Sequence, residues 1–592
     1  MKLSFYTSAL SLFISSAVSS TTSFTPCPLL GPAFPPYTLD TNDKIISKAL
    51  EALTQKFNTQ LGGGSGSHGE TSANTTFSVA LFSANPGTAA DEPFFWEYHY
   101  AAPWLNKSSA GPSPVHKDSV YRIGGLTEIF TVWSLLIGEG DNILDEPVTE
   151  YLPELKDGVP GQDIERVVWD EVTVGQLASH MSGLARDYCS KYVAARPGLP
   201  ELPTTNKTCC DNPYKCDSND FIKLISKQPP VAPAGVTPSY SNVAFQLLGY
   251  IIERRAGKPF IDVLEHDIFV ALNMTESSVF APVTDNTGLS PIIPISKQAS
   301  GWSTRLGGEE ASRSIYSSTK DVATAGQAIL NSTLLTQATT NRWLKPVAHT
   351  SNPANSLGLP FTIYLGGNYP DQSLVDVYTL LSNEGYKESL YSSYIGLVPD
   401  YGVGYVILSA DTQEPADLNA HADIIGDVVL AALVETSVLQ AGAKFNGTYT
   451  AAQAAGVNST TGLNSSITVG QDSLMGLYID EFISNGTDLR KTLAGFVGVE
   501  NSKDLSIRLY PTQLVGVDAG SDSSKQAFRA VLQDVTELAD NDTPTCVSWM
   551  DVDELQYGGR GLDEFVFSLD HSGRAVGVEI PALRVDLLRT KN

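Results

Sequence analysis

Few residues of this 592-residue chain stand in a familiar catalytic spacing. The segment GGSGS at 63–67 fails the Gly-x-Ser-x-Gly pattern because Ser67 occupies the position of the last glycine, and it lies in a predicted loop. The eight histidines show neither HExxH nor any other metal-binding spacing. Chemistry must therefore be sought among single serines, phenols and carboxyl groups, and the elements that position them matter.

Glu128 stands in the stretch YRIGGLTEIF at 121–130, which we interpret as the opening of an amphipathic helix. Helical spacing of the apolar residues leaves Gly125 and Glu128 together on another face of this helix. Thr127 points about 200° away from position 125, so its hydroxyl cannot serve the same face. The apolar residues that define the pattern are Leu126, Ile129, Phe130, Trp133 and Ile137.

Two interpretations of these residues remain open. In the structural one, Glu128 is a first-turn carboxylate that the helix dipole stabilises by about 0.3–1 kcal/mol, and Gly125 is an acceptable N-cap. In the functional one, Glu128 is a general base or acid with a raised pKa in a partly desolvated pocket. A third possibility is a serine nucleophile elsewhere, such as Ser241 or Ser389.

Tyr240, Ser241 and Asn242 precede a helical pattern over 242–255. Asn242 is predicted to be the N-cap of that helix, and Tyr240 is either a buried phenol with a hydrogen-bond partner or part of a pocket. We assign Tyr240 to a pocket, because Tyr-Ser-Asn followed directly by an amphipathic helix is a more specific pattern than a lone tyrosine. In the functional interpretation Glu128 faces Tyr240, and we expect these two residues to be catalytic.

Composition limits the possible partners. The chain has 38 Lys and Arg against 65 Asp and Glu, a formal net charge of −27, which argues against nucleic-acid binding. Residues 1–20 resemble a secretory signal peptide, and neither a later apolar run of spanning length nor a C-terminal anchor signal follows. We expect a secreted protein with a small-molecule substrate or ligand, no nucleic acid, no membrane anchor and no cofactor; the oligomeric state is left open.

Two features support that compartment. Six cysteines follow the signal; four lie close together, which favours two bridges within one loop and leaves Cys27 with Cys546. A zinc site is the alternative, although the cluster lacks paired CxxC spacing and a nearby histidine. The clustered cysteines are Cys189, Cys209, Cys210 and Cys216. Ten Asn-x-Ser/Thr sequons predict N-glycosylation. Their asparagines are Asn74, Asn106, Asn206, Asn273, Asn331, Asn446, Asn458, Asn464, Asn485 and Asn541.

The remaining pattern predicts mixed structure. After a leader at 21–39, a helix over 40–61 is followed by a hairpin of strands at 77–84 and 94–100. Helices then alternate with loops up to a second hairpin, at 391–397 and 404–410. Because the strands come as hairpins, the sheet should be antiparallel. A composition shift near 436–445 predicts domains at 40–438 and 439–592, the second rich in β-strands.

Five segments in this order resemble the serine β-lactamase and penicillin-binding protein family, of the class C and D-alanyl carboxypeptidase type. They are YRIGGLTEIFT at 121–131, ILDEPVTEYLPEL at 143–155, VTVGQLASHMSGL at 172–184, YSNVAFQLLGYIIERRAGKPF at 240–260 and SIYSSTKDVATAGQAIL at 314–330. The resemblance covers roughly 40–435 and implies an α+β fold, an antiparallel sheet flanked by helices with a helical subdomain. FNGTYT at 445–450 is similar to the start of a β-rich domain that some relatives carry.

The resemblance also implies an acyl-transfer site, which this chain matches only in part. The family's Ser-x-x-Lys falls on Gly125 and Glu128, so nucleophile and base are both replaced. The Tyr-x-Asn motif matches in full. The third motif falls on Asn383, Glu384 and Gly385, keeping the glycine and losing the cation. The resemblance implies that the substrate is bound by Gly125, Asn242, Asn383 and Gly385.

Two further residues take structural roles by the same resemblance. Ser317 and Lys320 have Ser-x-x-Lys spacing but fall in the family's later helix cap, and His180 is expected to be structural. The sequence therefore predicts a β-lactamase-like fold without the standard serine mechanism. We expect a hydrolase-like protein acting on a small molecule or ester, as in fungal secondary-metabolite biosynthesis; the alternative is an inactive pseudoenzyme that binds a ligand or protein partner.

Overall fold

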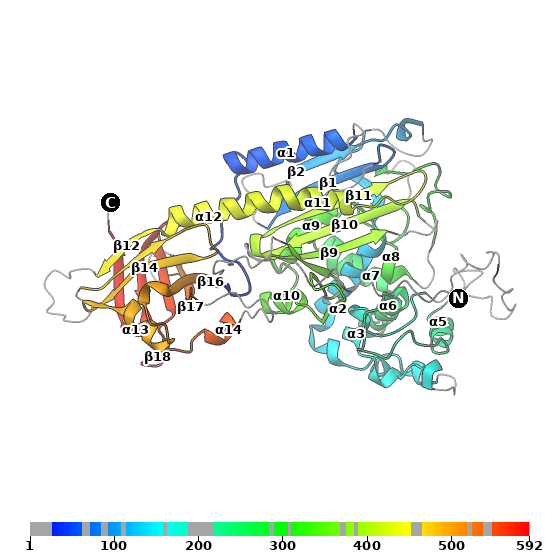
Figure 1. Ribbon diagram of the computed structural model, residues 1–592. Coiled ribbons are helices and arrows are strands. Elements are labelled where there is room, and N and C mark those ends of the chain that lie inside the picture. Colours follow the sequence, from blue (N-terminus) through cyan, green and yellow to red (C-terminus); the bar gives the residue numbers. More distant parts are fainter. Residues whose placement is uncertain are drawn as a thin grey trace, which may run out of the picture. The chain divides into compact units, whose positions relative to one another are not determined.

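The computed structural model describes residues 26–61, 72–84, 93–107, 114–157, 163–187, 198, 217–282, 289–305, 309–366, 375–383, 389–451, 464–517, 524–536 and 547–590. The chain forms two compact units. One comprises 38–366 with 374–436, and the other comprises 437–592 with 1–37 and 367–373. Figure 1 shows the helices and strands along the chain.

The first unit is built on an eight-stranded sheet in the order β2-β1-β11-β10-β9-β8-β7-β6. All of its neighbouring strands run antiparallel, as the hairpins in the sequence predict. The strands are β1 (Thr76–Ser83), β2 (Phe94–Tyr100), β6 (Ala348–His349), β7 (Asn355–Leu357), β8 (Thr362–Gly366), β9 (Val375–Asn383), β10 (Tyr391–Val398) and β11 (Val403–Ala410).

Helices cover both faces of this sheet, so β1, the second strand from its edge, is buried along its whole length. Side chains alternate between the faces of a strand. Phe77 therefore meets Phe57 of α1 (Lys44–Leu61) on one face, with ring centroids 6.0 Å apart. Phe82 points to the other face, where α9 (Thr319–Leu330) crosses β1 and β11.

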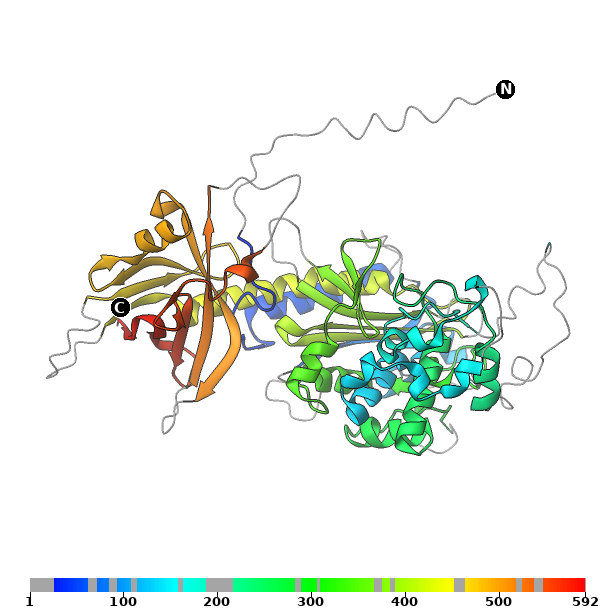
Figure 2. The ribbon, with the colours of Figure 1, turned by 90° about the horizontal axis from the view of Figure 1, so that it is seen from below.

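A helical region lies on the α9 side of the sheet (Figures 1 and 2). It is joined to the sheet by a small three-stranded sheet in the order β4-β3-β5. The helices are α2 (Thr127–Glu139), α3 (Val174–Ala178), α5 (Ser218–Ile225), α6 (Asn242–Ala256), α7 (Phe260–Leu264), α8 (Glu310–Arg313) and α10 (Gln337–Trp343). The small strands are β3 (Ser119–Arg122), β4 (Ser290–Pro291) and β5 (Tyr316–Ser318).

The prediction for 121–137 is wrong in two respects. The stretch does not open as helix: Tyr121 and Arg122 end β3, a 3-10 turn spans Gly124–Leu126, and α2 begins at Thr127. The expectation of one buried and one exposed helix face is also wrong, because the first ten residues of α2, Thr127 to Leu136, are all buried. Both faces are covered, since α2 packs against α6 and α8.

The second unit is an antiparallel β-barrel, which agrees with the predicted β-rich domain. Its nine strands follow the order β13-β12-β22-β21-β20-β17-β16-β14-β15, and a further pairing of β13 with β14 closes the ring. The strands are β12 (Gly447–Ala451), β13 (Ser466–Gly470), β14 (Leu477–Ser484), β15 (Thr487–Asp488), β16 (Leu505–Val517), β17 (Ser524–Asp534), β20 (Glu564–Leu569), β21 (Ala575–Ile580) and β22 (Val585–Arg589).

Aromatic rings fill the barrel. Phe445, at the end of α12 (Ala431–Phe445), packs edge-on against Phe528 and Phe567 at centroid distances of 5.3 and 5.2 Å. Two short helices, α13 (Leu489–Phe496) and α14 (Ser548–Asp551), and the small hairpin of β18 (Gln556–Tyr557) and β19 (Arg560–Gly561) complete the unit. Edge-to-face pairs of this kind add about 0.5–1.5 kcal/mol to the burial of each ring.

The described end of the leader belongs to this second unit. Ala33 and Phe34 are buried in its core, at 8% and 4% exposure. Cys27 is disulfide-bonded, and its backbone N–H donates to the side-chain oxygen of Gln533 at 3.1 Å. The other five cysteines lie outside the described residues, so the predicted pairing of Cys27 with Cys546 stays a prediction.

Candidate functional site

Glu128 lies in the first turn of α2 and is fully buried, with 0% exposure. Gly125 precedes it in the 3-10 turn and is buried too. The prediction that Gly125 is an N-cap is wrong, because Leu126 occupies the N-cap of α2. The turn places the backbone N–H of Gly125 at the N-terminal end of a thirteen-residue helix, where the helix dipole is positive.

Tyr240 and Asn242 are positioned by the start of α6. Ser241 is the N-cap: its Oγ accepts the N–H of Ala244 at 3.1 Å and donates to the carbonyl of Ala185 at 2.7 Å. The prediction that Asn242 caps the helix is therefore wrong. Ser241, buried and doubly bonded, serves the fold, and the structure gives it no access to the site as a nucleophile.

The side chains of Tyr240, Asn242 and Glu128 meet, together with Ser312 from α8. Tyr240 Oη lies 2.7 Å from Glu128 Oε1 and 3.2 Å from Asn242 Oδ1. Ser312 Oγ lies 2.6 Å from Asn242 Oδ1 and 3.0 Å from Glu128 Oε1. Each hydroxyl carries one proton. The shorter contacts therefore assign the Tyr240 proton to Glu128 and the Ser312 proton to Asn242.

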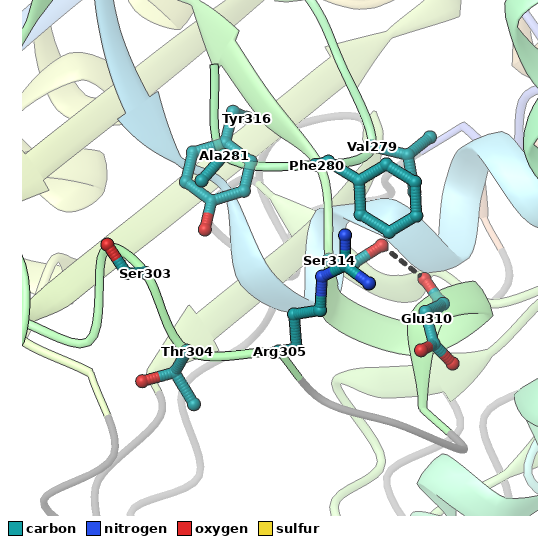
Figure 3. A pocket seen from close by; sticks show the side chains of 9 residues that line it. All are labelled: Val279, Phe280, Ala281, Ser303, Thr304, Arg305, Glu310, Ser314 and Tyr316. Atoms are coloured by element: carbon teal, nitrogen blue, oxygen red, sulfur yellow. Dashed lines mark hydrogen bonds between the residues drawn. The ribbon is translucent and has the colours of Figure 1, made fainter. Parts of the chain in front are cut away.

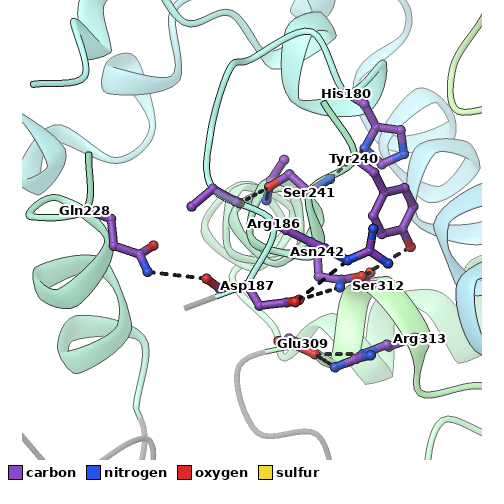
Figure 4. Close-up of polar contacts among 12 residues, drawn as sticks. His180, Arg186, Asp187, Gln228, Tyr240, Ser241, Asn242, Glu309, Ser312 and Arg313 are labelled. Atoms are coloured by element: carbon purple, nitrogen blue, oxygen red, sulfur yellow. Dashed lines mark hydrogen bonds and ion pairs between the residues drawn. The ribbon is translucent and has the colours of Figure 1, made fainter. Parts of the chain in front are cut away.

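His180 lies behind Tyr240 in the same network (Figure 4). The two rings face each other with centroids 4.5 Å apart. His180 Nδ1 accepts the backbone N–H of Ser241 at 3.2 Å, so neutral His180 carries its proton on Nε2. That nitrogen lies 3.3 Å from Glu128 Oε2, without the geometry of a hydrogen bond. His180 supports the ring of Tyr240 in the pocket wall and also contacts the carboxylate of Glu128.

The network holds Tyr240 in its protonated form. Burial raises the pKa of Tyr240 well above its ordinary value, and the charge of Glu128 and the hydrogen bond to it raise this pKa further. Arg313 and Arg186 oppose that increase. A phenol in this environment stays protonated and does not act as a phenolate base. It can accept a proton from another molecule only if a neighbouring group accepts the phenol proton at the same time.

A cavity of about 260 Å³ opens beside this network. Arg186 stacks on the Tyr240 ring at 4.5 Å, and Asn242 Nδ2 donates to Asp187 at 2.6 Å (Figure 4). Arg313 donates through Nε to Glu309 at 2.7 Å. The residues lining the cavity are Gly125, Arg186, Tyr240, Asn242, Arg313, Leu381 and Ser382.

Ser382, near the end of β9, lines the cavity together with Tyr240. Its Oγ accepts the backbone N–H of Gly125 at 2.7 Å. A Cβ at position 125 would lie 3.4 Å from Ser382 Oγ and 3.4 Å from Tyr240 Oη. The two hydroxyl oxygens thus approach the same point, which the glycine leaves open.

The structure brings together four of the predicted site residues. They are Gly125, Glu128, Tyr240 and Asn242. Asn383 follows Ser382 as the last residue of β9, and the structure describes the backbone of Asn383 but not its side chain. Gly385 lies outside the described residues. Ser389, the other alternative nucleophile, is buried, and its Oγ accepts the N–H of Tyr391 at 3.3 Å, away from the cavity lining.

Sequence reasoning missed four residues of the site: Ser312, Ser382, Arg186 and Arg313. Ser382 directly precedes the third motif, so the hydroxyl beside Asn383 was a usable signal. Ser312 and Arg313 lie only a few residues before the last resembling segment. For Arg186 we find no signal, because it lies outside the five resembling segments.

A second, smaller cavity of about 130 Å³ lies beside α8 (Figure 3). Arg305 stacks on Phe280 at 4.5 Å there, and Glu310 of α8 and its C-cap residue Ser314 also line this cavity. None of the predicted site residues lines it. The larger cavity, with its phenol and carboxylate, is therefore the candidate active site.

Within the described ranges, no three His, Cys, Asp or Glu side chains converge as metal ligands would. In the same ranges, no helix has the length and apolar character needed to cross a bilayer.

Comparison with known proteins gives relatives along almost the whole chain. A "Beta-lactamase-like protein" of Arthroderma benhamiae is 28% identical over 555 residues, covering 88% of this chain and 89% of the relative. A "Probable hydrolase M10" of a Phoma species is 23% identical over 521 residues, covering 83% and 82%. A "Probable hydrolase clz13" of Cochliobolus lunatus is 22% identical over 544 residues, covering 83% and 82%.

Among solved structures, a β-lactamase/D-alanine carboxypeptidase from Yersinia pestis matches with a TM-score of 0.46 and 18% identity, covering 65% of this chain and 99% of that one. A family model described as a "Beta-lactamase-like-like, C-terminal domain" matches residues 438–591. The model described as "Beta-lactamase" matches residues 97–430, more than half of the chain and the whole of the site above. The chain therefore belongs to the β-lactamase family.

Proposed function

We propose that this protein hydrolyses a small molecule or ester without the acyl-enzyme of the Ser-x-x-Lys mechanism. The observation that carries the proposal is the contact of Tyr240 Oη with the buried carboxylate of Glu128, at 2.7 Å, in the wall of the cavity. A serine at 125 and a lysine at 128 would be needed for the standard reaction, and neither is present.

Tyr240 and Glu128 can activate a water molecule together. As the water oxygen attacks the carbonyl carbon, its proton passes to Tyr240 Oη and the Tyr240 proton passes to Glu128 Oε1. Because the pKa of Tyr240 is raised, the two transfers must be coupled. Reversal of both transfers protonates the leaving group. Asn242 and Ser312 flank this pair: Ser312 donates to Asn242 Oδ1, which lies 3.2 Å from Tyr240 Oη, and Ser312 Oγ lies 3.0 Å from Glu128 Oε1.

Turnover of a panel of small p-nitrophenyl esters by the purified protein tests this proposal. We expect Glu128→Gln and Tyr240→Phe each to lower kcat by about 100-fold or more, because positioned proton transfer contributes about 10²–10⁴-fold. Glu310→Gln alters a carboxylate that lines the second cavity and not the candidate active site, so it should leave kcat unchanged. A fluorophosphonate probe should not label the protein. Full activity in Glu128→Gln, or a labelled serine, would contradict the proposal.

One observation favours a second candidate function, a pseudoenzyme that binds a ligand. In serine acyl transfer the backbone N–H at the nucleophile position stabilises the oxyanion. Here that N–H, from Gly125, is already bonded to Ser382 Oγ. Binding of a cavity ligand that is unchanged in Glu128→Gln and Tyr240→Phe, with no turnover by the wild type, would establish this second function.

We also propose that the protein is a secreted glycoprotein with disulfide bonds. Six sequon asparagines are exposed, as glycosylation requires, and Asn446 is partly buried. The exposed ones are Asn74, Asn106, Asn273, Asn331, Asn464 and Asn485; Asn206, Asn458 and Asn541 lie outside the described residues. Mass spectrometry of secreted material before and after peptide N-glycosidase treatment would locate the glycans. Protein retained inside the producing cell would contradict secretion.

The relatives named as probable hydrolases support a hydrolytic role, and we propose that it belongs to fungal secondary metabolism. Disruption of the gene, followed by comparison of the small molecules in the culture medium, tests this placement. Accumulation of one ester or related precursor is the expected result.

A further inference from the structure

Ser382 is held by a contact that changes what its hydroxyl can do. Its Oγ accepts the N–H of Gly125 at 2.7 Å, and its side chain is buried at 7% exposure. The accepted N–H belongs to the turn that leads into α2, so it carries the positive end of the helix dipole. A hydroxyl that accepts such a bond becomes a stronger donor, because hydrogen bonds in a chain polarise one another.

The proton of Ser382 is directed by its surroundings. A serine hydroxyl donates one hydrogen bond and can accept two. Within the described part of the chain, the hydrogen bond of the Ser382 hydroxyl is the one that it accepts from Gly125, and no acceptor there receives its proton. Because Ser382 lines the cavity, the O–H can rotate toward a ligand in it.

The position of this donor relative to Tyr240 is set by Gly125. Ser382 Oγ and Tyr240 Oη each lie 3.4 Å from the point where a Cβ at 125 would stand. A carbonyl group bound near that point is within reach of both Tyr240, where water is activated, and Ser382. The carbonyl oxygen then needs a donor, and the Gly125 N–H no longer reaches it directly.

We propose that the Ser382 hydroxyl is the oxyanion donor of this site. The Gly125 N–H polarises this hydroxyl, and the hydroxyl in turn donates a hydrogen bond to the ligand oxygen in the cavity. The inference rests on the proposed hydrolytic function and deepens it: the ligand is a carboxylic ester whose carbonyl oxygen points at β9. When the water oxygen bonds to the carbonyl carbon, the carbonyl π electrons move onto oxygen, which accepts the Ser382 proton in a hydrogen bond. When the bond to the leaving group breaks, the carbonyl re-forms and Ser382 keeps its proton.

Paired ligands test the donor directly. A phosphonate monoester is tetrahedral and anionic, as the intermediate is, whereas the matching carboxamide is planar and neutral. In Ser382→Ala we expect phosphonate affinity, measured by titration calorimetry, to fall about 10- to 100-fold and carboxamide affinity to change less than twofold. Turnover should show a kcat about 10²–10³-fold lower with KM nearly unchanged, the usual cost of one lost oxyanion donor.

Ser409→Ala is the matched control. Ser409 is a fully buried serine on β11 whose Oγ donates to the carbonyl of Ser392 at 3.1 Å, and it does not line the cavity. It should change neither ligand affinity nor kcat. Ser382→Thr keeps the hydroxyl and should retain the preference for the phosphonate. Thermal unfolding of each variant shows that the fold is intact.

The outcomes separate the two proposals. Equal loss of phosphonate and carboxamide in Ser382→Ala, unchanged phosphonate affinity, or no phosphonate binding by the wild type would overturn the donor role. If instead Glu128→Gln and Tyr240→Phe leave turnover intact, water activation by these residues is wrong. The binding experiment needs no turnover, so it reads the role of Ser382 in either case.

Discussion

At the scale of single residues, position 128 holds a glutamate where the family pattern has a lysine, so a hydrogen-bond acceptor replaces a donor. A lysine there would donate hydrogen bonds to its neighbours, whereas Glu128 accepts one from Tyr240 and lies 3.0 Å from the hydroxyl oxygen of Ser312. A buried carboxylate needs such donors, because an unpaired buried charge costs several kcal/mol. The hydroxyls that surround position 128 are thus matched to glutamate, and a lysine alone would not restore the family's chemistry.

Gly125→Ala tests the open position between the two hydroxyls. The added Cβ would make ordinary contacts of 3.4 Å with Ser382 and Tyr240, so we expect the melting temperature to change little. The methyl group would occupy the point that we assign to the substrate carbonyl. We therefore expect kcat/KM for esters to fall at least about tenfold, each tenfold loss being about 1.4 kcal/mol. A variant as active as the wild type would place the reacting carbonyl elsewhere.

At the scale of elements, the packing of α9 on the sheet depends on a missing side chain. Gly326 of α9 faces Phe82 of β1, and a Cβ at 326 would lie 2.3 Å from the ring. Glycine inside a helix normally costs about 1 kcal/mol relative to alanine. Here the close approach of a buried aromatic ring explains why glycine is kept.

We expect Gly326→Ala to destabilise the protein, although alanine is the better helix former. Overpacking a core costs about 1–3 kcal/mol, which outweighs the gain in helix propensity. Gly138 of α2 is the matched control, because a Cβ there meets nothing within 4 Å and its backbone is helical. Gly138→Ala should stabilise by about 0.5–1 kcal/mol. Chemical denaturation measures both; a stabilised Gly326→Ala would contradict the packing.

His421 of α11 (Asn419–Ile425) makes the contact of α11 with β1 sensitive to pH. Its ring packs against Phe77 at 4.8 Å, and burial lowers its pKa from 6.5 to about 4. The unfolded chain therefore binds a proton as the pH falls below 6.5, while the folded protein does not until about pH 4. Folding stability must fall across this window, by about 3 kcal/mol in total.

His421→Leu should remove that part of the pH dependence. The unfolding free energy, measured between pH 7 and pH 4, should show a slope reduced by the titration of one group in the variant. His266→Gln, a change at a side chain that is 79% exposed, should keep the wild-type slope. Identical slopes in His421→Leu and the wild type would show that His421 titrates normally.

The sequence predicted the elements better than it predicted the site. Local signals were sufficient for the helix at 242–255 and the one at 318–331, which the structure places at Asn242–Ala256 and Thr319–Leu330. The contact of Glu128 with Tyr240, 112 residues away, was expected from the motifs, whereas Ser312, 184 residues from Glu128, was missed because no local pattern links the two. Helical periodicity reports which face is apolar and cannot report what covers the other face.

At the scale of the whole molecule, the chain has two separate hydrophobic cores. One surrounds α2, α6 and the small sheet, and the other fills the barrel. The short segment 26–37 belongs to the second core, although more than four hundred residues of chain separate it from β12. The stability of the barrel therefore depends on residues 26–37, which lie a few residues after the predicted signal peptide.

Phe34→Ala tests this dependence. Phe34 is 4% exposed within the barrel core, and truncation of a buried phenylalanine costs about 3–5 kcal/mol. Proteolysis at rising temperature, with fragments mapped by mass spectrometry, should release peptides from 447–589 at a lower temperature than in the wild type. Leu30→Ala, a change at a side chain that is 78% exposed, should leave that temperature unchanged.

The same variant should leave the cavity intact, because Phe34 and the site residues belong to different cores. We expect the affinity of Phe34→Ala for the phosphonate to equal that of the wild type at temperatures below the new transition. Loss of affinity while peptides from 447–589 are still protected would show that the two cores are coupled. Equal cleavage temperatures for Phe34→Ala and Leu30→Ala would show that segment 26–37 adds nothing to the barrel.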